Sequence, residues 1–160
     1  MRQATIEEIK ELPYQDPFTK GNLQLLFCSM DDQFILSAKK NAEVLSLDKN
    51  KPNGTVLVKD DVVIGNGANG SDYHLRHQCE RVRLGIPTGQ GYELCEGCHP
   101  KNHGEPKAIK NALDQGNDPR DADLYLWGHW WFCESCCKTM IEAGIKRVIL
   151  PEGAKKQFGR

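Results

Sequence analysis

Four residues in the C-terminal half of the chain carry side chains that could bind and use a metal ion. Cys133 and Cys136 form a C-x-x-C motif at the start of a predicted helix, and a spacing of three places both sulfurs on one helix face. The helix N-terminus favours the thiolate forms that metals bind. His103 begins another predicted helix, and Glu105 follows two residues later. Three ligands leave a fourth zinc position open for water, which is typical of a catalytic site, and Glu105 can face that water without binding the metal.

Each motif taken alone has a second interpretation. A C-x-x-C motif also fits a redox pair, and a histidine at a helix start also fits a cap or a surface residue. The metal interpretation therefore depends on the histidine and the two cysteines coming together from the N-termini of two helices that flank one strand.

A second group of metal-binding side chains lies in residues 70–102, a long segment with little hydrophobic periodicity. Three cysteines with one histidine would make a closed structural zinc site, and such a site would keep this segment ordered. Reduced cysteines without a metal are the alternative. The expected ligands are Cys79, Cys95, Cys98 and His77, with His74 or His99 as the alternative fourth ligand.

The composition restricts the class of protein. The chain has 160 residues, a formal net charge of -1 and seven cysteines. No apolar run is long enough to span a membrane, and no basic patch indicates a partner such as duplex nucleic acid. We expect a cytoplasmic protein whose cysteines are reduced, so metal binding or catalysis explains them better than disulfides do. Cys28 is expected to be a buried or a surface thiol, and Cys137 a packing residue.

The elements that would position these residues alternate between helices and strands. A short helix with a capping box is predicted at the N-terminus, where Thr5 precedes Glu8 by three residues. The order that follows is α-β-β-α-β-α-β, which indicates a three-layer α/β/α domain, residues 1–160, around a mixed β-sheet. The predicted elements are a helix after the caps Asp31 and Asp32, a hairpin over 55–67, a helix over 103–116, a strand over 121–127, a helix over 133–144 and a strand over 145–150.

These motifs, in this order, resemble the cytidine and deoxycytidylate deaminase superfamily, most closely the deoxycytidylate deaminases. The H-x-E and C-x-x-C motifs match the zinc deaminase signature. "DQFILSAKKNAEVLS" and "GTVLVKDDVVIGNGANGS" resemble the first helix and hairpin of the family, and "CESCCKTMIEAGIKRVIL" resembles its second zinc helix and the strand after it. "CERVRLGIPTGQGYELC" is similar to an insert of some microbial members. The resemblance covers about residues 31–150, with the insert at about 70–102.

The resemblance implies a cytidine deaminase-like fold and hydrolytic deamination of a cytosine nucleotide, dCMP to dUMP with release of ammonia. It implies that His103, Cys133 and Cys136 hold a catalytic zinc, and that Glu105 moves protons between water, the pyrimidine and the leaving ammonia. Asn69 matches the family asparagine that touches the sugar, although an N-G turn is its alternative. A homo-oligomer is also expected. The alternatives are another substrate, such as a nucleoside, a modified cytosine nucleotide or an RNA base, or an inactive zinc-binding protein with the same fold.

Several positions depart from the family pattern. Gly104 stands where the family usually has alanine, Lys107 where it has asparagine, and Phe132 where it has proline. "WGHWWF" brings Trp130 and Trp131 beside the first zinc cysteine, where they could stack on a base or pack the core or an oligomer interface.

Phosphate recognition also departs from the family pattern. An arginine-bearing stretch that often follows the N-G of deoxycytidylate deaminases is absent, and "SDYHLRHQ" stands there. The candidate phosphate contacts are Arg76, Arg81 and Lys101, and each of them could equally be a solvated charge.

Overall fold

A six-stranded mixed sheet forms the centre of the computed structural model, which describes residues 1–159. The strand order is β1-β2-β6-β5-β3-β4. β2, β6 and β5 are parallel, whereas β3 pairs antiparallel with both β5 and β4, and β1 pairs antiparallel with β2. The strands are β1 (Arg2–Gln3), β2 (Gln24–Cys28), β3 (Gly54–Lys59), β4 (Val62–Ala68), β5 (Asp123–Trp127) and β6 (Arg147–Pro151).

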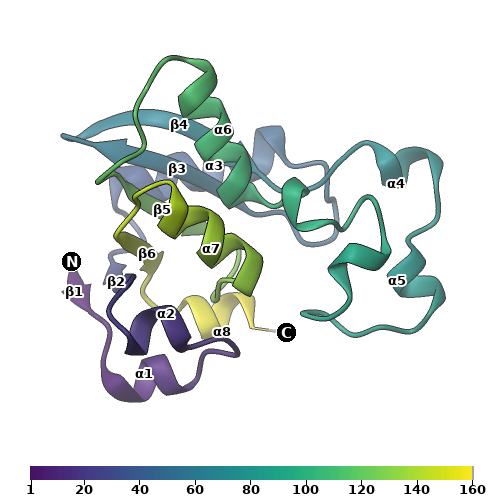
Figure 1. Ribbon diagram of the computed structural model, residues 1–160, viewed down its shortest axis with the longest axis horizontal. Helices are drawn as coiled ribbons and strands as arrows, with labels where there is room; N and C mark the ends of the chain where they lie inside the picture. Colours follow the sequence, from purple (N-terminus) through teal and green to yellow (C-terminus); the bar gives the residue numbers. More distant parts are fainter. Residues whose placement is uncertain (160) are drawn as a thin grey trace.

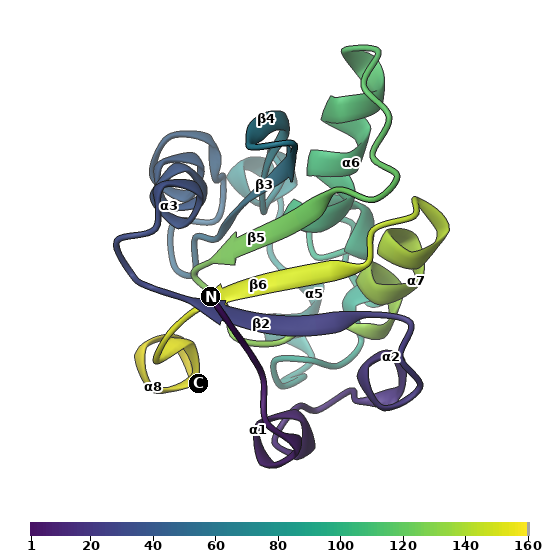
Figure 2. The ribbon, with the colours of Figure 1, turned by 90° about the vertical axis from the view of Figure 1, so that its left-hand side faces the viewer.

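Helices cover both faces of this sheet. Figure 2 shows α3 (Gln33–Leu45) on one face and α6 (Gly104–Asp114) with α7 (Glu134–Glu142) on the other. The shorter helices are α1 (Ile6–Lys10), α2 (Asp16–Thr19), α4 (Tyr73–Arg76), α5 (Glu80–Arg83) and α8 (Ala154–Phe158). The expected three-layer α/β/α arrangement around a mixed sheet is therefore confirmed.

Side chains that alternate between the two faces of the central strands form two hydrophobic cores, one on each side of the sheet. Leu124 and Leu126 of β5 face the helices α6 and α7, whereas Tyr125 between them faces α3. Since successive side chains of a strand point to opposite faces, a strand that is buried on both faces needs apolar residues at both its odd and its even positions. The cluster below α6 and α7 is the larger of the two, and it contains Cys136 and Cys137, so the start of α7 is anchored in packed side chains.

Local signals explain why the helices begin and the hairpin turns where they do. The Asp32 carboxylate caps α3 by accepting hydrogen bonds from the backbone N–H groups of Phe34 (2.8 Å) and Ile35 (3.2 Å). The β3–β4 hairpin turns at Asp60 and Asp61, both with positive φ, as a two-residue hairpin turn of this type requires. The capping box of Thr5 and Glu8 is present at α1.

The N-terminal strands are absent from the sequence expectation. β2 is a five-residue strand that pairs with β6 far along the chain, and β1 has only two residues. Such short runs carry little periodicity, and β2 pairs with β6 more than a hundred residues away, so local patterns did not indicate these strands.

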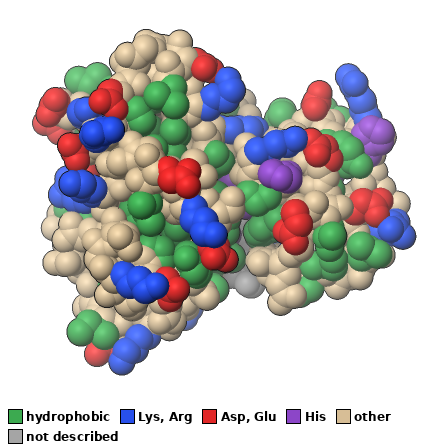
Figure 3. All heavy atoms as spheres, in the orientation of Figure 1, with side chains coloured by type: hydrophobic (Ala, Val, Ile, Leu, Met, Phe, Trp, Pro, Cys, Tyr) green, Lys and Arg blue, Asp and Glu red, His purple; other side chains and the backbone are tan. Residues whose placement is uncertain are grey.

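Residues 70–102 form a lobe beside the main body, which we call the insert (Figure 1). It contains α4, α5 and two 3-10 turns, η1 (Tyr92–Leu94) and η2 (Pro100–Asn102). Few of its side chains are buried, and Leu75, Val82 and Leu84 are more than half exposed. Figure 3 shows hydrophobic side chains on the surface of this lobe. The insert therefore lacks the apolar core that would order a segment of this length.

The insert begins and ends at one point of the fold. The Gly70 N–H donates to the carbonyl of Asn102 over 2.9 Å, and the Asn102 side chain donates to the carbonyl of Glu96 over 2.8 Å.

Within residues 1–159, no helix is both long and apolar enough to cross a membrane.

Candidate active site

His103, Cys133 and Cys136 come together where α6 and α7 begin. The His103 Nδ1 lies 3.3 Å from the Cys136 Sγ and 3.6 Å from the Cys133 Sγ. His103 is the N-cap residue of α6, and Cys133 is the N-cap residue of α7. The Cys133 Sγ accepts a hydrogen bond from the Cys136 N–H, which fixes the turn between the two thiols. The sequence expectation of three ligands from two neighbouring helix starts thus agrees with the placement of these side chains.

This donor set fits a zinc ion. Tetrahedral zinc with bonds of about 2.3 Å to sulfur and about 2.0–2.1 Å to nitrogen keeps its ligand atoms about 3.5–3.8 Å apart. The distances around His103 are within a few tenths of an ångström of that spacing. Hydrogen bonds from Cys136, followed by the contact with His103, lower the pKa of Cys133 to about 4. The hydrogen bond to Cys133, followed by burial, raises the pKa of Cys136, so the site stabilises one thiolate, that of Cys133.

Glu105 lies in the first turn of α6 and is 7 % exposed. Burial raises the pKa of its carboxyl group above the ordinary value, since desolvation penalises the charged form. Its neighbour Gly104 packs against β3, where the Thr55 hydroxyl donates to the Gly104 carbonyl over 2.8 Å. Two rigid elements thus hold a carboxyl group whose proton affinity suits acid-base exchange.

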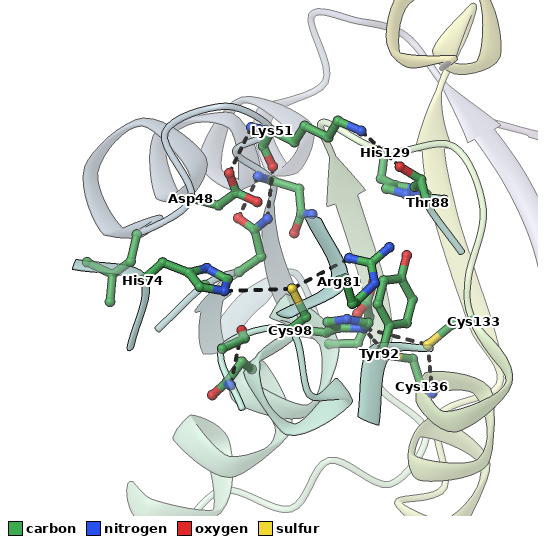
Figure 4. Close-up of a pocket in the computed structure, with 18 of the residues that line it drawn as sticks. Asp48, Lys51, His74, Arg81, Thr88, Tyr92, Cys98, His129, Cys133 and Cys136 are labelled. Atoms are coloured by element: carbon green, nitrogen blue, oxygen red, sulfur yellow. Dashed lines mark hydrogen bonds between the residues drawn. The ribbon is translucent and has the colours of Figure 1, made fainter. Parts of the chain in front are cut away.

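A single cavity contains both Glu105 and the three-residue cluster. Figure 4 shows its lining, in which Lys51 extends toward Thr88 and His129. In the same view Arg81 and Tyr92 lie between Cys98 on one side and Cys133 with Cys136 on the other. Three loops supply these residues: the segment after α3, the insert and the segment after β5.

The cavity rim carries a lysine that the sequence interpretation did not single out. The Lys51 ammonium group donates to the Thr88 hydroxyl over 3.0 Å, which joins the segment after α3 to the insert across the opening. Among the expected phosphate contacts, Arg81 lines this cavity, whereas Arg76 and Lys101 line a different hollow of the insert. Single charges in loops have no characteristic spacing, so nothing in the sequence separates Lys51 from other surface lysines.

Asn69 lies at the cavity, but its amide is engaged within the chain. Its Oδ1 accepts from the Ser46 hydroxyl (2.6 Å) and from the Asn53 N–H (2.9 Å), and its Nδ2 donates to the Lys51 carbonyl (2.8 Å). These hydrogen bonds fix the segment that carries Lys51. Asn69 lines the cavity, and its expected contact with the sugar stays a prediction. Asn53 also lines the cavity, and its buried Oδ1 accepts no hydrogen bond from any residue of 1–159.

The two tryptophans of "WGHWWF" occupy different environments. Trp131 lines the cavity with its ring against Gly89 of the insert, where an added Cβ would lie 3.4 Å away. Trp130 instead packs against the main core, with the Lys155 ammonium 5.3 Å from its ring centre. His129 orients this segment, because its Nδ1 accepts from the N–H groups of Trp130 and Trp131. Trp131 thus lines the cavity where a base could stack, whereas Trp130 is not among the residues that line it. The expected contact of either ring with a base stays a prediction.

The second group of ligands also assembles, with one change of residue. The His74 Nε2 lies 3.2 Å from the Cys95 Sγ and 3.8 Å from the Cys98 Sγ, and the Sγ atoms of Cys79 and Cys98 are 3.6 Å apart. All four ligand atoms lie within 4.8 Å of one another, again close to a tetrahedral spacing. We call these four residues the insert cluster.

His74, one of the two alternatives, corrects the preferred choice of His77. The His77 ring is stacked on Tyr73, with ring centres 4.5 Å apart, and it does not join the insert cluster. His99 caps η2 by accepting the Lys101 N–H at its Nδ1, so it serves the chain between the two clusters. The sequence favoured His77 because it lies two residues before Cys79. In the structure the turn after α4 leaves His74 beside the sulfurs instead.

The other two cysteines pack in the core. Cys28 and Cys137 are both buried, and burial raises the pKa of each thiol to about 12. Neither belongs to a metal-binding group of the described residues.

The chain belongs to the family described as "Cytidine and deoxycytidylate deaminase zinc-binding region", whose model matches residues 28–152. It is by class a zinc-dependent deaminase of the cytidine deaminase superfamily. The matched region runs from the end of β2 to the residue after β6 and contains both Cys/His clusters. No curated protein matches the chain.

Two solved structures resemble the chain at low identity. The dCMP deaminase of the cyanophage S-TIM5, in apo form, is 19% identical with a TM-score of 0.50, over 78% of this chain and 86% of that one. The second is a diaminohydroxyphosphoribosylaminopyrimidine deaminase/5-amino-6-(5-phosphoribosylamino)uracil reductase of Thermotoga maritima. It is 22% identical with a TM-score of 0.44, over 78% of this chain and 32% of that one. The first match confirms the cytidine deaminase-like fold.

Proposed function

We propose that the protein hydrolyses the amino group of a cytosine nucleotide, with dCMP to dUMP as the main reaction and ammonia as the second product. One observation carries the proposal: His103, Cys133 and Cys136 meet at one end of the cavity that also contains the buried Glu105. A metal with three protein ligands keeps a position for water, and zinc bound there would make that water more acidic.

The chain's own residues account for the proton movements of this reaction. Glu105 accepts a proton from the attacking water and delivers it to N3 of the pyrimidine. The water oxygen bonds to C4 as a hydroxyl group, and Glu105 passes the proton of that hydroxyl to N4. The C4–N4 bond then breaks, ammonia leaves, and the oxygen remains on C4 as a carbonyl. Burial of Glu105 supports both steps, because it raises the pKa of the carboxyl group and so makes that group a better proton acceptor.

The cavity walls support a base with a phosphate attached. Trp131 and Tyr92 offer aromatic surface to a planar ring. Lys51 and the Thr88 hydroxyl, which meet at the rim, offer a cation and a hydroxyl to an anionic group. We therefore assign phosphate recognition to Lys51 in place of the three basic residues expected from the sequence.

An ammonia-release panel tests the substrate. It compares dCMP, CMP, deoxycytidine, cytidine, the triphosphates, adenine and guanine compounds and an RNA stem-loop. We expect dCMP to have the highest kcat/KM. Lys51→Ala should raise KM for dCMP about tenfold or more, because a hydrogen bond to a charged group contributes about 1.5–3 kcal/mol. Deoxycytidine should be affected little.

Lys49→Ala provides the matched control, because Lys49 lies in the same segment and outside the cavity lining. If Lys51→Ala weakened the nucleoside and the nucleotide equally, the phosphate assignment would be wrong. If no cytosine compound released ammonia, the substrate class would be wrong.

We also propose that the insert cluster holds a structural zinc ion. Its four ligands close the coordination shell, and the insert has almost no buried apolar surface to order it otherwise. Metal analysis should find about two zinc ions per chain, one for each cluster. His74→Ala should lower the metal content by one ion and reduce the melting temperature.

His77→Ala is the control for this site, since it removes a neighbouring histidine that lies outside the cluster. Equal metal loss in both variants, or a single zinc ion in the unaltered protein, would contradict the assignment of His74.

A further inference from the structure

Tyr92 is an aromatic residue of the insert that contacts His103. We call His103, Cys133 and Cys136 the catalytic cluster. Its ring meets the His103 imidazole at 89°, with ring centres 4.9 Å apart, which is an edge-to-face arrangement. Tyr92 and His103 come from different parts of the fold, because η1 belongs to the insert and His103 begins α6. The contact therefore connects the insert with a proposed zinc ligand.

The His103 imidazole needs such a contact. All its hydrogen-bonding contacts within the described residues involve Nδ1, the atom that faces Cys133 and Cys136. A metal-binding histidine is usually oriented by a hydrogen bond from its other ring nitrogen to a protein acceptor. In this chain the aromatic ring of Tyr92 packs beside the His103 imidazole. That contact can limit rotation of the imidazole, as a hydrogen bond from the other ring nitrogen would.

Arg81 holds Tyr92 in place from the other side. Its guanidinium carbon lies 4.5 Å from the centre of the Tyr92 ring, in a cation-π geometry. The Arg81 Nε donates to the Gln90 carbonyl and its Nη2 to the Pro87 carbonyl, both over 2.9 Å. The Tyr92 hydroxyl accepts the Gly89 N–H over 3.1 Å. Two hydrogen bonds from Arg81 thus shape the loop that presents Tyr92.

The same guanidinium contacts the insert cluster. The Arg81 Nη1 lies 3.5 Å from the Cys98 Sγ, and Figure 4 shows this contact as a dashed line. Three thiolates with one neutral histidine would leave a zinc site with a net charge of -1, so an arginine beside one sulfur balances that charge. Arg81 therefore touches a ligand of the insert cluster and the ring that packs on a ligand of the catalytic cluster.

We propose that Arg81 and Tyr92 are positioning residues that transmit the fold of the insert cluster to the orientation of His103. The proposal rests on the proposed zinc-dependent deaminase function. The insert would then affect catalysis, since loss of the insert cluster would release Tyr92 from its contact with His103. It also separates Arg81 from Lys51, whose role is phosphate recognition.

Cadmium-113 NMR of the cadmium-loaded protein gives a readout that does not depend on turnover. The two clusters differ in their number of sulfur ligands, so each should give its own resonance. We expect Tyr92→Leu to shift the resonance of the two-cysteine cluster and to leave that of the insert cluster in place. Arg81→Met should shift both resonances.

The kinetic expectation follows from the same geometry. With dCMP, Tyr92→Leu and Arg81→Met should lower kcat about 10- to 100-fold, the usual effect of losing a group that orients a metal ligand. Tyr92→Phe keeps the ring and should recover most of kcat. Arg83→Met is the matched control, because Arg83 lies on the same helix and pairs with Glu80 at the surface.

Three outcomes would overturn the proposal. They are an unshifted two-cysteine resonance in Tyr92→Leu, an Arg81→Met variant in which only KM for the nucleotide rises, and a Tyr92→Phe variant as slow as Tyr92→Leu. If the unaltered protein released no ammonia from any cytosine compound, the proposed function would fail, and the cadmium resonances would still test the contact.

Discussion

Glu105 illustrates what residue spacing can and cannot predict. The H-x-E spacing indicated an acid-base residue beside a metal, and the structure puts this carboxyl group in the same cavity as the three ligands. Spacing did not indicate its almost complete burial, at a point of α6 where the neighbouring Gly104 packs against Thr55 of β3. Sequence spacing identifies groups that act together along one helix, whereas the environment of each group depends on distant strands.

Glu105→Gln should abolish the proton transfer while it preserves the shape of the side chain. We expect ammonia release from dCMP to fall about 10²- to 10⁴-fold, the usual contribution of a positioned acid-base group. Zinc content should be unchanged, because Glu105 is not one of the cluster residues. Steady-state kinetics with metal analysis checks both points. Glu134→Gln, at an exposed position of α7, is the control, and retained turnover in Glu105→Gln would reject the role.

Lys51 and Tyr92 show the opposite case. Both line the cavity, and neither belongs to a motif. Lys51 reaches the site because Asn69 fixes its backbone, and Tyr92 reaches it because the insert folds back over α6. Such residues are found only when the loops are placed in space.

At the scale of elements, the sequence was most informative where a helix carries its own start signal. Of the two aspartates expected to cap α3, Asp32 makes the hydrogen bonds to the helix N-terminus. β2 had no comparable signal, because its place beside β6 depends on parallel pairing across the molecule. Helices capped by nearby residues are therefore easier to predict than short strands whose partners are distant.

Asp32→Ala should destabilise the protein by about 1 kcal/mol, the typical cost of removing a helix cap. The loss arises because two backbone N–H groups at the start of α3 lose their acceptor. Chemical denaturation should show a lower free energy of unfolding with an unchanged denaturant slope. Asp31→Ala is the matched control, since it removes a neighbouring carboxylate that caps nothing in the structure. Equal destabilisation by the two changes would contradict the assignment of the cap.

At the scale of the whole molecule, ion pairs tie the two ends of the chain together. Arg2 donates to the carboxylate of Glu8 (2.8 Å) and to that of Glu152 (2.5 Å). The second pair joins β1 to the segment after β6, across nearly the whole length of the sequence. Pairs this distant in sequence were not predictable from charge patterns. The expected homo-oligomer stays a prediction, and light scattering from the purified protein tests it.

The stability supplied by Glu8 should depend on pH. Hydrogen bonds from Arg2 lower the pKa of Glu8 from its ordinary value of 4.5 to about 2. Because the folded pKa is the lower one, the contribution is complete above pH 4.5 and is lost as the pH falls through 2. The melting-temperature difference between the unaltered protein and Glu8→Gln should therefore shrink over that range. Glu7→Gln should show no such trend, and a constant Glu8 difference down to pH 2 would contradict the pairing.

The hydrogen bond between Gly70 and Asn102 closes the neck of the insert. A segment whose ends are neighbours can be gained, lost or lengthened without moving the sheet, because the flanking elements already meet at that point. Yet this segment contributes Tyr92 and Thr88 to the cavity lining. A segment that could be exchanged without disturbing the sheet thus forms part of the wall of the candidate active site. Exchanging it between related chains should change the lining of that cavity while the sheet and its helices stay intact.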